Sequence, residues 1–350
     1  GYNLPFANKR QGQSELMKAT YLTMKANSIL YAIAPTGIGK TMATIFSTLK
    51  SMTKPNEKLF YLTAKTIGRE VAIDSFRMLQ NEGLKLHAIV ISSKAKSCAS
   101  KMQHCDPEKC SFAKGYFSRL RQAIEDIYTN EILYNQETIM KYALKYNICP
   151  FEYSLDLSYF CDAIICDYNY VFDPKAHLIR YFEDTEYQPK ILCDESHNLV
   201  ERSKDMYSAE FDSLLPLRIE EKISSYDKTI TKNIRHFYDE LKKYDDLVNK
   251  DLFYYSHLLD DLMLSSLKQI VQKAELVLAD NKEIKDRDEI LTDYFLLKDF
   301  VDTAEFFGQS HMFVVKKIED NHFQIEIKCA DASDFIYDTV KNKTKGIVFF

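Results

Sequence analysis

The sequence predicts an α/β protein built on a parallel β-sheet, with a phosphate-binding loop and a helical insertion. Three observations support this fold class. Short, continuously apolar segments alternate with amphipathic segments over the first 200 residues, which is typical of a parallel sheet covered on both faces. A Gly-Lys-Thr sequence, Gly39-Lys40-Thr41, lies just after the first apolar segment. Residues 205–307 contain no glycine and one proline, and their apolar residues recur at helical spacing.

Length and composition bound the possibilities further. A chain of 350 residues exceeds the roughly 250–300 residues at which single cores stop growing, so we expect more than one unit. No apolar run approaches the ~18 residues that a membrane span needs. The N-terminal segment, residues 1–5, lacks the basic and apolar stretches of a secretory signal. We therefore expect a cytoplasmic protein without a membrane partner, whose eight cysteines are reduced.

The predicted elements follow in chain order. The first strand, 29–33, is stopped by Pro35 and followed by the glycine loop and a helix over 41–49. A further helix is predicted over 69–79. The remaining strands of this first part are predicted at 59–62, 87–91, 163–166 and 191–193. After Gly308 the pattern alternates again, predicting strands at 311–315, 322–327 and 346–350. We interpret these as a return to the same sheet after an all-helical insertion.

The loop from Ala34 to Thr41 has the context that phosphate binding requires, because it follows a strand and opens a helix. Lys40 is expected to reach the β and γ phosphates of ATP, and the Thr41 hydroxyl to bind Mg²⁺. The loop residues expected to surround the phosphates are Thr36, Gly37, Ile38, Gly39, Lys40 and Thr41. A chance glycine turn is the alternative, which the flanking strand and Lys-Thr pair disfavour.

A second acidic motif, Asp194-Glu195-Ser196-His197, follows the apolar run 191–193. An acidic residue at a strand end can hold Mg²⁺, and its neighbour can polarise the water that attacks the γ-phosphate. We assign Asp194 to the metal, Glu195 to the water, and His197 to coupling the nucleotide to the rest of the site. The alternative is an acidic helix N-cap without catalytic function.

Four cysteines lie between these two motifs, in a basic stretch: Cys98, Cys105, Cys110 and Cys149. Four thiolates could bind Zn²⁺ or a [4Fe–4S] cluster, and the spacing alone does not decide between them. The other cysteines lie in or beside apolar strands, where buried structural thiols are expected. They are Cys161, Cys166, Cys193 and Cys329.

Charge is distributed unevenly along the chain. Residues 205–305 carry 14 basic and 23 acidic side chains, although the whole chain has a net charge of only −5. Residues 94–121 instead carry a basic surplus that could meet an acidic polymer. A solvated surface is the alternative for this stretch.

Together these motifs resemble the XPD/DinG family of iron–sulfur superfamily 2 DNA helicases. The resemblance rests on the glycine loop, the four cysteines, 149-CPFEY-153, 165-ICDYNYVFDP-174 and 194-DESHNL-199, which occur in family order. It implies a RecA-like parallel-sheet motor domain with an inserted iron–sulfur cluster domain and an inserted helical Arch domain. The implied ranges are 1–95, 156–204 and 311–350 for the motor domain, 96–155 for the cluster domain and 205–310 for the Arch domain.

The resemblance also implies cofactors and partners. It implies that the four cysteines hold a [4Fe–4S] cluster. It also implies 5′→3′ translocation on single-stranded DNA, with forked or tailed duplexes as substrates. Gln13 resembles the adenine-reading glutamine of the family. Residues expected to contact DNA are Thr63, Lys65, Thr66, Lys114, Arg119, Arg121, Tyr168 and Asn169. The alternative for Lys65 and Gln13 is that they are solvated surface residues without a ligand. The alternative for residues 168–170 is that they pack between the cluster domain and the sheet and do not contact bases.

The last predicted strand resembles the one that leads into the family's Ser-Ala-Thr-type motif. The second RecA-like domain with its arginine finger is not within these residues, so we expect a fragment that is nearly inactive alone. Two alternatives to an ATP-dependent DNA helicase stay open: a non-catalytic nucleic-acid-binding module, and a phosphate-loop ATPase with a structural zinc site.

Overall fold

A computed structural model describes residues 2–5, 10–35, 37–100, 105–106, 108–183, 186–248, 251–280 and 284–350. The chain divides into two compact units. Unit 1 comprises residues 1–200 and 335–350, and unit 2 comprises residues 201–334. Each unit has its own hydrophobic core. No helix in the described ranges is both long and apolar enough to cross a membrane.

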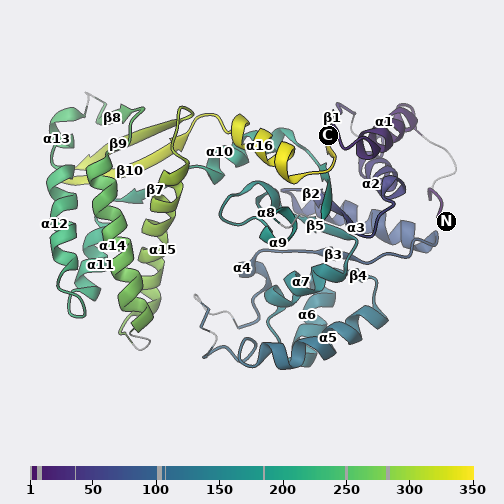
Figure 1. Ribbon diagram of the computed structural model, residues 1–350, viewed down its shortest axis with the longest axis horizontal. Coiled ribbons are helices and arrows are strands. Elements are labelled where there is room, and N and C mark those ends of the chain that lie inside the picture. Colours follow the sequence, from purple (N-terminus) through teal and green to yellow (C-terminus); the bar gives the residue numbers. More distant parts are fainter. Residues whose placement is uncertain are drawn as a thin grey trace. The chain divides into compact units, whose positions relative to one another are not determined.

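Unit 1 is built on a seven-stranded sheet, and all its described pairings are parallel. The strand order is β1-β11-β6-β2-β5-β3-β4, so the first and last strands of the chain are neighbours (Figure 1). The strands are β1 (Ile29–Tyr31), β2 (Glu57–Leu62), β3 (Ala88–Val90), β4 (Leu133–Tyr134), β5 (Ala163–Cys166), β6 (Gln188–Cys193) and β11 (Ile347–Phe349).

Both faces of this sheet are covered, as the apolar strand segments predict. Every residue of β2 is buried. Leu59 and Tyr61 join the core cluster that includes residues of the second and third helices, whereas Phe60 contacts Tyr181 and Phe182. The helices before the sequence enters unit 2 are α1 (Gln13–Lys25), α2 (Lys40–Ser51), α3 (Thr66–Asn81), α4 (Lys94–Ser97), α5 (Tyr116–Asn130), α6 (Gln136–Tyr146), α7 (Pro150–Leu157), the 3₁₀ turn Ser158–Phe160, α8 (Asn169–Phe172) and α9 (Ile179–Phe182).

Local sequence explains the helix ends around the cysteines. The Asn135 side chain accepts a hydrogen bond from the Thr138 amide at the start of α6, and Asn147 ends that helix in the left-handed conformation. Pro150 opens α7, where its missing amide hydrogen is not needed. Cys149 therefore lies directly before a helix whose start is fixed.

Unit 2 combines helices with a four-stranded antiparallel sheet of order β7-β10-β9-β8. Helix α10 (His197–Met206) enters it and α16 (Ser333–Lys343) leaves it. The elements between are β7 (Ala209–Asp212), α11 (Leu215–Ile223), α12 (Ile230–Leu241), α13 (Tyr244–Leu247), β8 (Phe253–Ser256), α14 (Asp261–Asp280), α15 (Arg287–Thr303), the 3₁₀ turn Ala304–Phe306, β9 (His311–Glu319) and β10 (His322–Cys329).

The structure corrects two expectations about this region. The block 205–310 is not all helical, because β7 and β8 lie within it. The hairpin of β9 and β10 does not return to the parallel sheet; it pairs with β7 and β8, so residues 311–334 belong to unit 2. Its inward residues, among them Phe313, Val315 and Ile325, pack into the core of the helices. Only β11 returns to the sheet of unit 1.

A buried lysine on β6 pairs with a carboxylate on β2 and hydrogen-bonds to the end of α1. Lys190 on β6 is 2% exposed, and its ammonium donates to the Met24 carbonyl and to Asn27 Oδ1, both at 2.6 Å. It also lies 3.4 Å from Glu57 Oε1. Burial lowers the pKa of Lys190, and the Glu57 carboxylate opposes that shift. A buried charge keeps its partners because desolvation penalises an unpaired one.

We predict that Lys190→Ala destabilises unit 1 by about 3–5 kcal/mol, because it leaves Glu57 buried without its cation. Chemical denaturation measures the change. Lys54→Ala is the matched control, since this lysine is exposed and its ammonium hydrogen-bonds to Gln188 at 3.5 Å, while the backbone amide that it donates to Glu57 is kept in the variant; it should change stability by less than ~1 kcal/mol. Pairing Lys190→Met with Glu57→Gln should recover part of the loss. Equal stability of Lys190→Ala and wild type would contradict the prediction.

Candidate active site

The candidate site lies where neighbouring strands of unit 1 end. The loop after β1 leads into α2, the chain after β6 continues into Asp194, and the chain after β2 continues into Thr63. Because all the strands are parallel, these three ends meet at one edge of the sheet. The sequence interpretation placed the phosphate-binding and metal-binding residues on the first two of these segments and DNA-contacting residues on the third.

Two glycines of the loop adopt positive φ angles. Gly37 and Gly39 have φ angles of 85° and 80°, which side chains rarely adopt. Gly39 immediately precedes α2, and Lys40 and Thr41 are the first residues of that helix. The helix N-terminus and its free amides favour an anion at this point. Ile38 lies between the two glycines and is half-buried, whereas Thr36 lies outside the described residues.

The acidic motif faces the glycine loop. The Lys40 ammonium lies 3.4 Å from Glu195 Oε1, so the two sequence motifs meet in space. Glu195 has a φ of 48°, an uncommon conformation for a residue other than glycine. His197 is 69% exposed, and its Nδ1 lies 3.7 Å from Glu195 Oε2. Asp194 is only 6% exposed.

Tyr61 connects the two halves of the site, although no sequence motif had pointed to it. Its ring is buried in β2, and its hydroxyl lies 3.4 Å from Thr41 Oγ1 and is also hydrogen-bonded to the Asp194 carboxylate. Burial raises the pKa of Asp194, and the neighbouring charge of Glu195 adds to that shift, whereas Tyr61 and Lys40 oppose it. Burial likewise raises the pKa of Tyr61, assisted by Asp194.

Gln13 packs against the glycine loop. It is 3% exposed, and a Cβ added at Gly39 would lie 2.8 Å from its Nε2. The Gln13 Oε1 accepts from the Arg10 amide at 3.2 Å, while the Arg10 side chain donates to the Gly37 carbonyl. Beside them is a cavity of about 380 Å³ that Met42 and Val71 also line. Arg10 was not predicted as a site residue.

The segment after β2 holds two exposed residues and one buried one. Lys65 and Thr66 are exposed at the start of α3. Thr63 is 1% exposed, and its Oγ1 accepts from the Lys65 amide at 3.4 Å. Thr63 therefore shapes the loop, contrary to the expectation that it contacts DNA. A Cβ on Gly68 would clash with Thr63 Oγ1 and Asp194 Oδ2, so this loop adjoins the metal-assigned carboxylate.

Tyr168 was expected to contact DNA but is buried. Its ring is fully buried, so it offers no face on which a base could stack, and its hydroxyl donates to the backbone carbonyls of Asp194 and Glu195. It therefore supports the turn that carries both acidic residues. Asn169 is half-buried and donates to Asp173 Oδ2 at 3.1 Å.

Of the four cysteines of the predicted cluster site, Cys105 and Cys149 both lie near Lys94. Cys105 hydrogen-bonds to the Lys94 side chain, and the charges of Cys105 and Cys149 both raise the pKa of Lys94 against the opposing effect of burial. Burial raises the pKa of Cys149, while the Glu152 and Phe151 amides that donate to it oppose the shift. Cys98 lies 3.2 Å from Ser100 Oγ, and Cys110 is buried.

The donor chemistry suits an iron–sulfur cluster, because thiolates are the ligands such clusters take. Within the described ranges, however, no three His, Cys, Asp or Glu side chains are grouped so that they could hold a metal ion. Cys161, Cys166 and Cys193 are buried, and burial raises the pKa of each thiol. They behave as the structural thiols that the sequence predicts.

The basic residues near the cysteines differ in availability. The Arg119 guanidinium donates to the Lys114 and Asn147 carbonyls at 2.7 and 2.8 Å, so it fastens the start of α5 instead of projecting into solvent. Lys114 is exposed. Arg121 is exposed and pairs with Glu125 at 2.9 Å, a weak surface pair. Lys114 and Arg121 remain the available cations of this set.

Part of the chain is similar to known helicases. The DEAD_2 family model matches residues 79–214. The XPD helicase subunit of general transcription and DNA repair factor IIH from Dictyostelium discoideum is 28% identical over 145 residues, which is 41% of this chain and 17% of that protein. A regulator of telomere elongation helicase 1 homolog from Aedes aegypti is 30% identical over 124 residues, 35% of this chain and 11% of that protein.

Solved structures share the fold. An XPD helicase has a TM-score of 0.62 at 17% identity, covering 98% of this chain and 58% of that one. A truncated XPD has a TM-score of 0.56 at 15% identity, covering 97% of this chain and 92% of that one. The family model and the curated relatives show that part of the chain is similar to XPD-like superfamily 2 helicases. Its matches span less than a fifth of the length of these curated relatives.

We predict that Asp194→Asn raises the melting temperature at neutral pH. The pKa of Asp194 is raised in the folded chain, so its ionisation there opposes folding increasingly as pH rises above the unfolded value of about 4. The neutral amide removes that penalty. The gain should vanish below about pH 4, where the carboxyl is protonated in both states.

Differential scanning fluorimetry across pH measures this effect, with Asp74→Asn as the control. Asp74 lines the cavity beside Gln13 and pairs with Arg77 on the surface, so its variant should show no such pH-dependent gain. A melting temperature of Asp194→Asn that equals or falls below that of wild type at neutral pH would contradict the prediction.

Proposed function

We propose that this chain is the nucleotide-binding motor unit of an ATP-dependent DNA helicase. One observation carries the proposal: Lys40 meets Glu195 at 3.4 Å, while Tyr61 hydrogen-bonds both Thr41 and Asp194. The phosphate-binding and acidic motifs thus form one site. The helicase relatives support DNA as the polymer on which the unit acts.

The residues present suit a Mg²⁺–ATP complex. Thr41 and the buried Asp194 would hold Mg²⁺, which when bound neutralises charge on the phosphates. Lys40 places its ammonium at the helix N-terminus, where it stabilises negative charge on the transferring phosphate. Glu195 orients the attacking water and accepts its proton. The exposed His197, near Glu195 Oε2, couples the nucleotide to the rest of the site.

Gln13 and Arg10 place the nucleotide base. Gln13 touches Gly39 and lines the cavity beside the glycine loop together with Arg10. A base in this cavity would meet their polar groups on one side and the apolar Met42 and Val71 on another, a mixture that is common in ligand pockets. We infer that the adenine of ATP occupies it.

For nucleic acid we propose contacts from exposed residues only: Lys65 and Thr66 at the start of α3, and Lys114 and Arg121 beside the cysteines. Ammonium and guanidinium groups neutralise phosphates independently of sequence. The substrates are single-stranded DNA and forked or tailed duplexes. The 5′→3′ direction of translocation follows from the resemblance to the family.

We further propose that Cys98, Cys105, Cys110 and Cys149 hold a [4Fe–4S] cluster with a structural function. The nearness of Cys105 and Cys149 to Lys94 supports this, as does the placement of Cys149 at the start of α7. The ligands surround the segment that carries Lys114, so their cross-linking would hold that cation in place. A structural zinc ion is the alternative occupant of the same thiols.

We predict that Lys40→Ala weakens Mg²⁺–ATP binding by at least about tenfold, the equivalent of one charge-assisted hydrogen bond, and that it eliminates hydrolysis by the full-length protein. Affinity for single-stranded DNA should change less than about twofold, since the proposed DNA contacts lie elsewhere. Fluorescent nucleotide titration and DNA anisotropy measure the two. Lys50→Ala, at the other end of α2, is the control. A parallel loss of DNA affinity in a folded Lys40→Ala chain would show that the sites are not separate.

We predict that Cys105→Ser removes bound iron and weakens single-strand binding at least about fivefold, while nucleotide binding changes little, because the ligands lie apart from the phosphate loop. Iron and sulfide analysis, brown absorption, and both titrations check this. Cys329→Ala in unit 2 is the control. Stoichiometric zinc in a colourless wild-type chain, or iron loss with unchanged DNA affinity, would refute the proposed cluster and its function respectively.

A further inference from the structure

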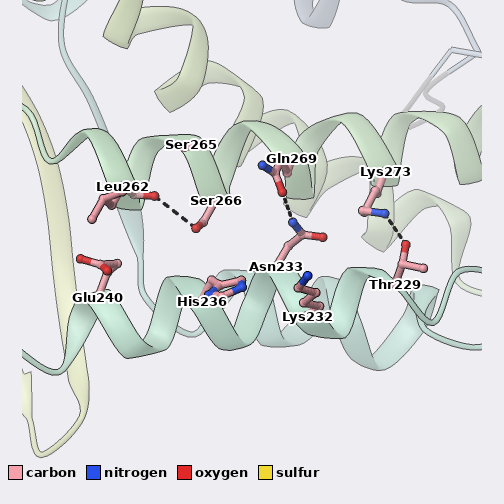
Figure 2. A pocket seen from close by; sticks show the side chains of 10 residues that line it. All are labelled: Thr229, Lys232, Asn233, His236, Glu240, Leu262, Ser265, Ser266, Gln269 and Lys273. Atoms are coloured by element: carbon pink, nitrogen blue, oxygen red, sulfur yellow. Dashed lines mark hydrogen bonds between the residues drawn. The ribbon is translucent and has the colours of Figure 1, made fainter.

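A groove between α12 and α14 of unit 2 is lined by residues that belong to none of the sites proposed above (Figure 2). Its volume is about 500 Å³, within the ~300–1,000 Å³ that small-molecule sites occupy. The two helices run antiparallel along it, so that Thr229 faces Lys273 at one end and Glu240 lies near Leu262 at the other. Nothing in the proposed helicase mechanism accounts for this groove.

Most of the side chains that line the groove are polar, with Leu262 as the apolar exception. The apolar side chains of α12, including Ile234 and Phe237, belong to the core of unit 2. The groove instead receives Asn233 and Ser266, which are 7% and 8% exposed. Asn233 donates across the groove to Gln269 Oε1. Each amide keeps a further donor or acceptor for which the described residues supply no partner.

Charge is concentrated at one end. Lys273 is already engaged, because it contacts the Thr229 hydroxyl and lies 3.5 Å from Asp227 Oδ2. Lys232 is exposed and forms no ion pair within the described part of the chain. The Glu240 carboxylate lies at the opposite end. An incoming anion would therefore meet Lys232 first, and the amide pair next.

We propose that this groove binds a small phosphate ester. Its phosphate pairs with Lys232, and its polar body hydrogen-bonds to Asn233 and Gln269. The volume accommodates a ligand of roughly nucleoside-monophosphate size. The proposal goes beyond the helicase function and does not depend on it.

A nucleic acid strand fits the groove less well. Among the described side chains that line it, the imidazole of His236 is the one ring, so successive bases of a strand would have a single surface on which to stack. Residues 205–305 carry 14 basic and 23 acidic side chains, and this net negative field opposes a polyanion. A compact anion responds mainly to the nearby Lys232, because more distant charges are screened beyond about 10 Å.

The test uses the full chain carrying Lys40→Ala, which suppresses phosphate binding at the glycine loop. Titration calorimetry with inorganic phosphate and with ribose 5-phosphate should show saturable binding of both. Adding Lys232→Ala should weaken both at least about tenfold, as expected for loss of a charged contact. Adding Gln269→Ala should weaken ribose 5-phosphate at least about threefold and leave inorganic phosphate within about twofold, because the amide contacts only the ester's body.

Lys268→Ala is the matched control, since Lys268 is exposed on α14 but does not line the groove. It should change either affinity less than about twofold. Circular dichroism confirms that each variant is folded. Three results would overturn the proposal: no saturable binding of either probe, an equal loss in Lys268→Ala, or Lys232-dependent binding of a single-stranded oligonucleotide that is tighter than that of ribose 5-phosphate.

Discussion

The candidate site depends on the hydrogen bonds of one buried hydroxyl, that of Tyr61. The ring lies in the core of unit 1, 6.3 Å from Phe350, and a buried phenol must find hydrogen-bond partners. Those partners are Thr41 on α2 and Asp194 after β6. The separation between the glycine loop and the acidic motif is therefore set by packing within the sheet. Tyr168 adds a second buried hydroxyl that holds the backbone of Asp194 and Glu195, so the acidic motif is supported from both sides.

Much of this site could be predicted because its chemistry follows strand ends, and strand ends are visible as breaks in apolar runs. Lys40, Asp194 and Glu195 lie where the sequence placed them. Tyr61 could not be found in this way, since it lies inside the apolar run of β2 and its partners come from distant segments. The burial of Tyr168 and Thr63 was missed for a related reason: a polar residue just past a strand can face solvent or the core, and a single sequence does not distinguish the two. Arg119 looked like a free cation because its carbonyl partners come from loop backbone.

Unit 2 shows a second limit of sequence reasoning. Alternation at 311–329 predicted strands but carries no information about which strands they pair with. The partners β7 and β8 are four residues long each and are surrounded by helical sequence, so their pattern is too short to be recognised. The result is a helical layer closed by an antiparallel sheet, with a core of its own. Its negative charge belongs to this separate body and should not be averaged with the charge of unit 1.

The position of β11 has a consequence for synthesis. This strand lies between β1 and β6, yet it comes from residues 347–349, after all of unit 2. When the first 200 residues have left the ribosome, their sheet still has a gap between β1 and β6. At about 5–20 residues per second, unit 2 then takes on the order of ten seconds to emerge. All strands of unit 2 are therefore synthesised before β11. During that time the candidate site of unit 1 stays incomplete, and the unpaired edges of β1 and β6 can bind chaperones or another chain.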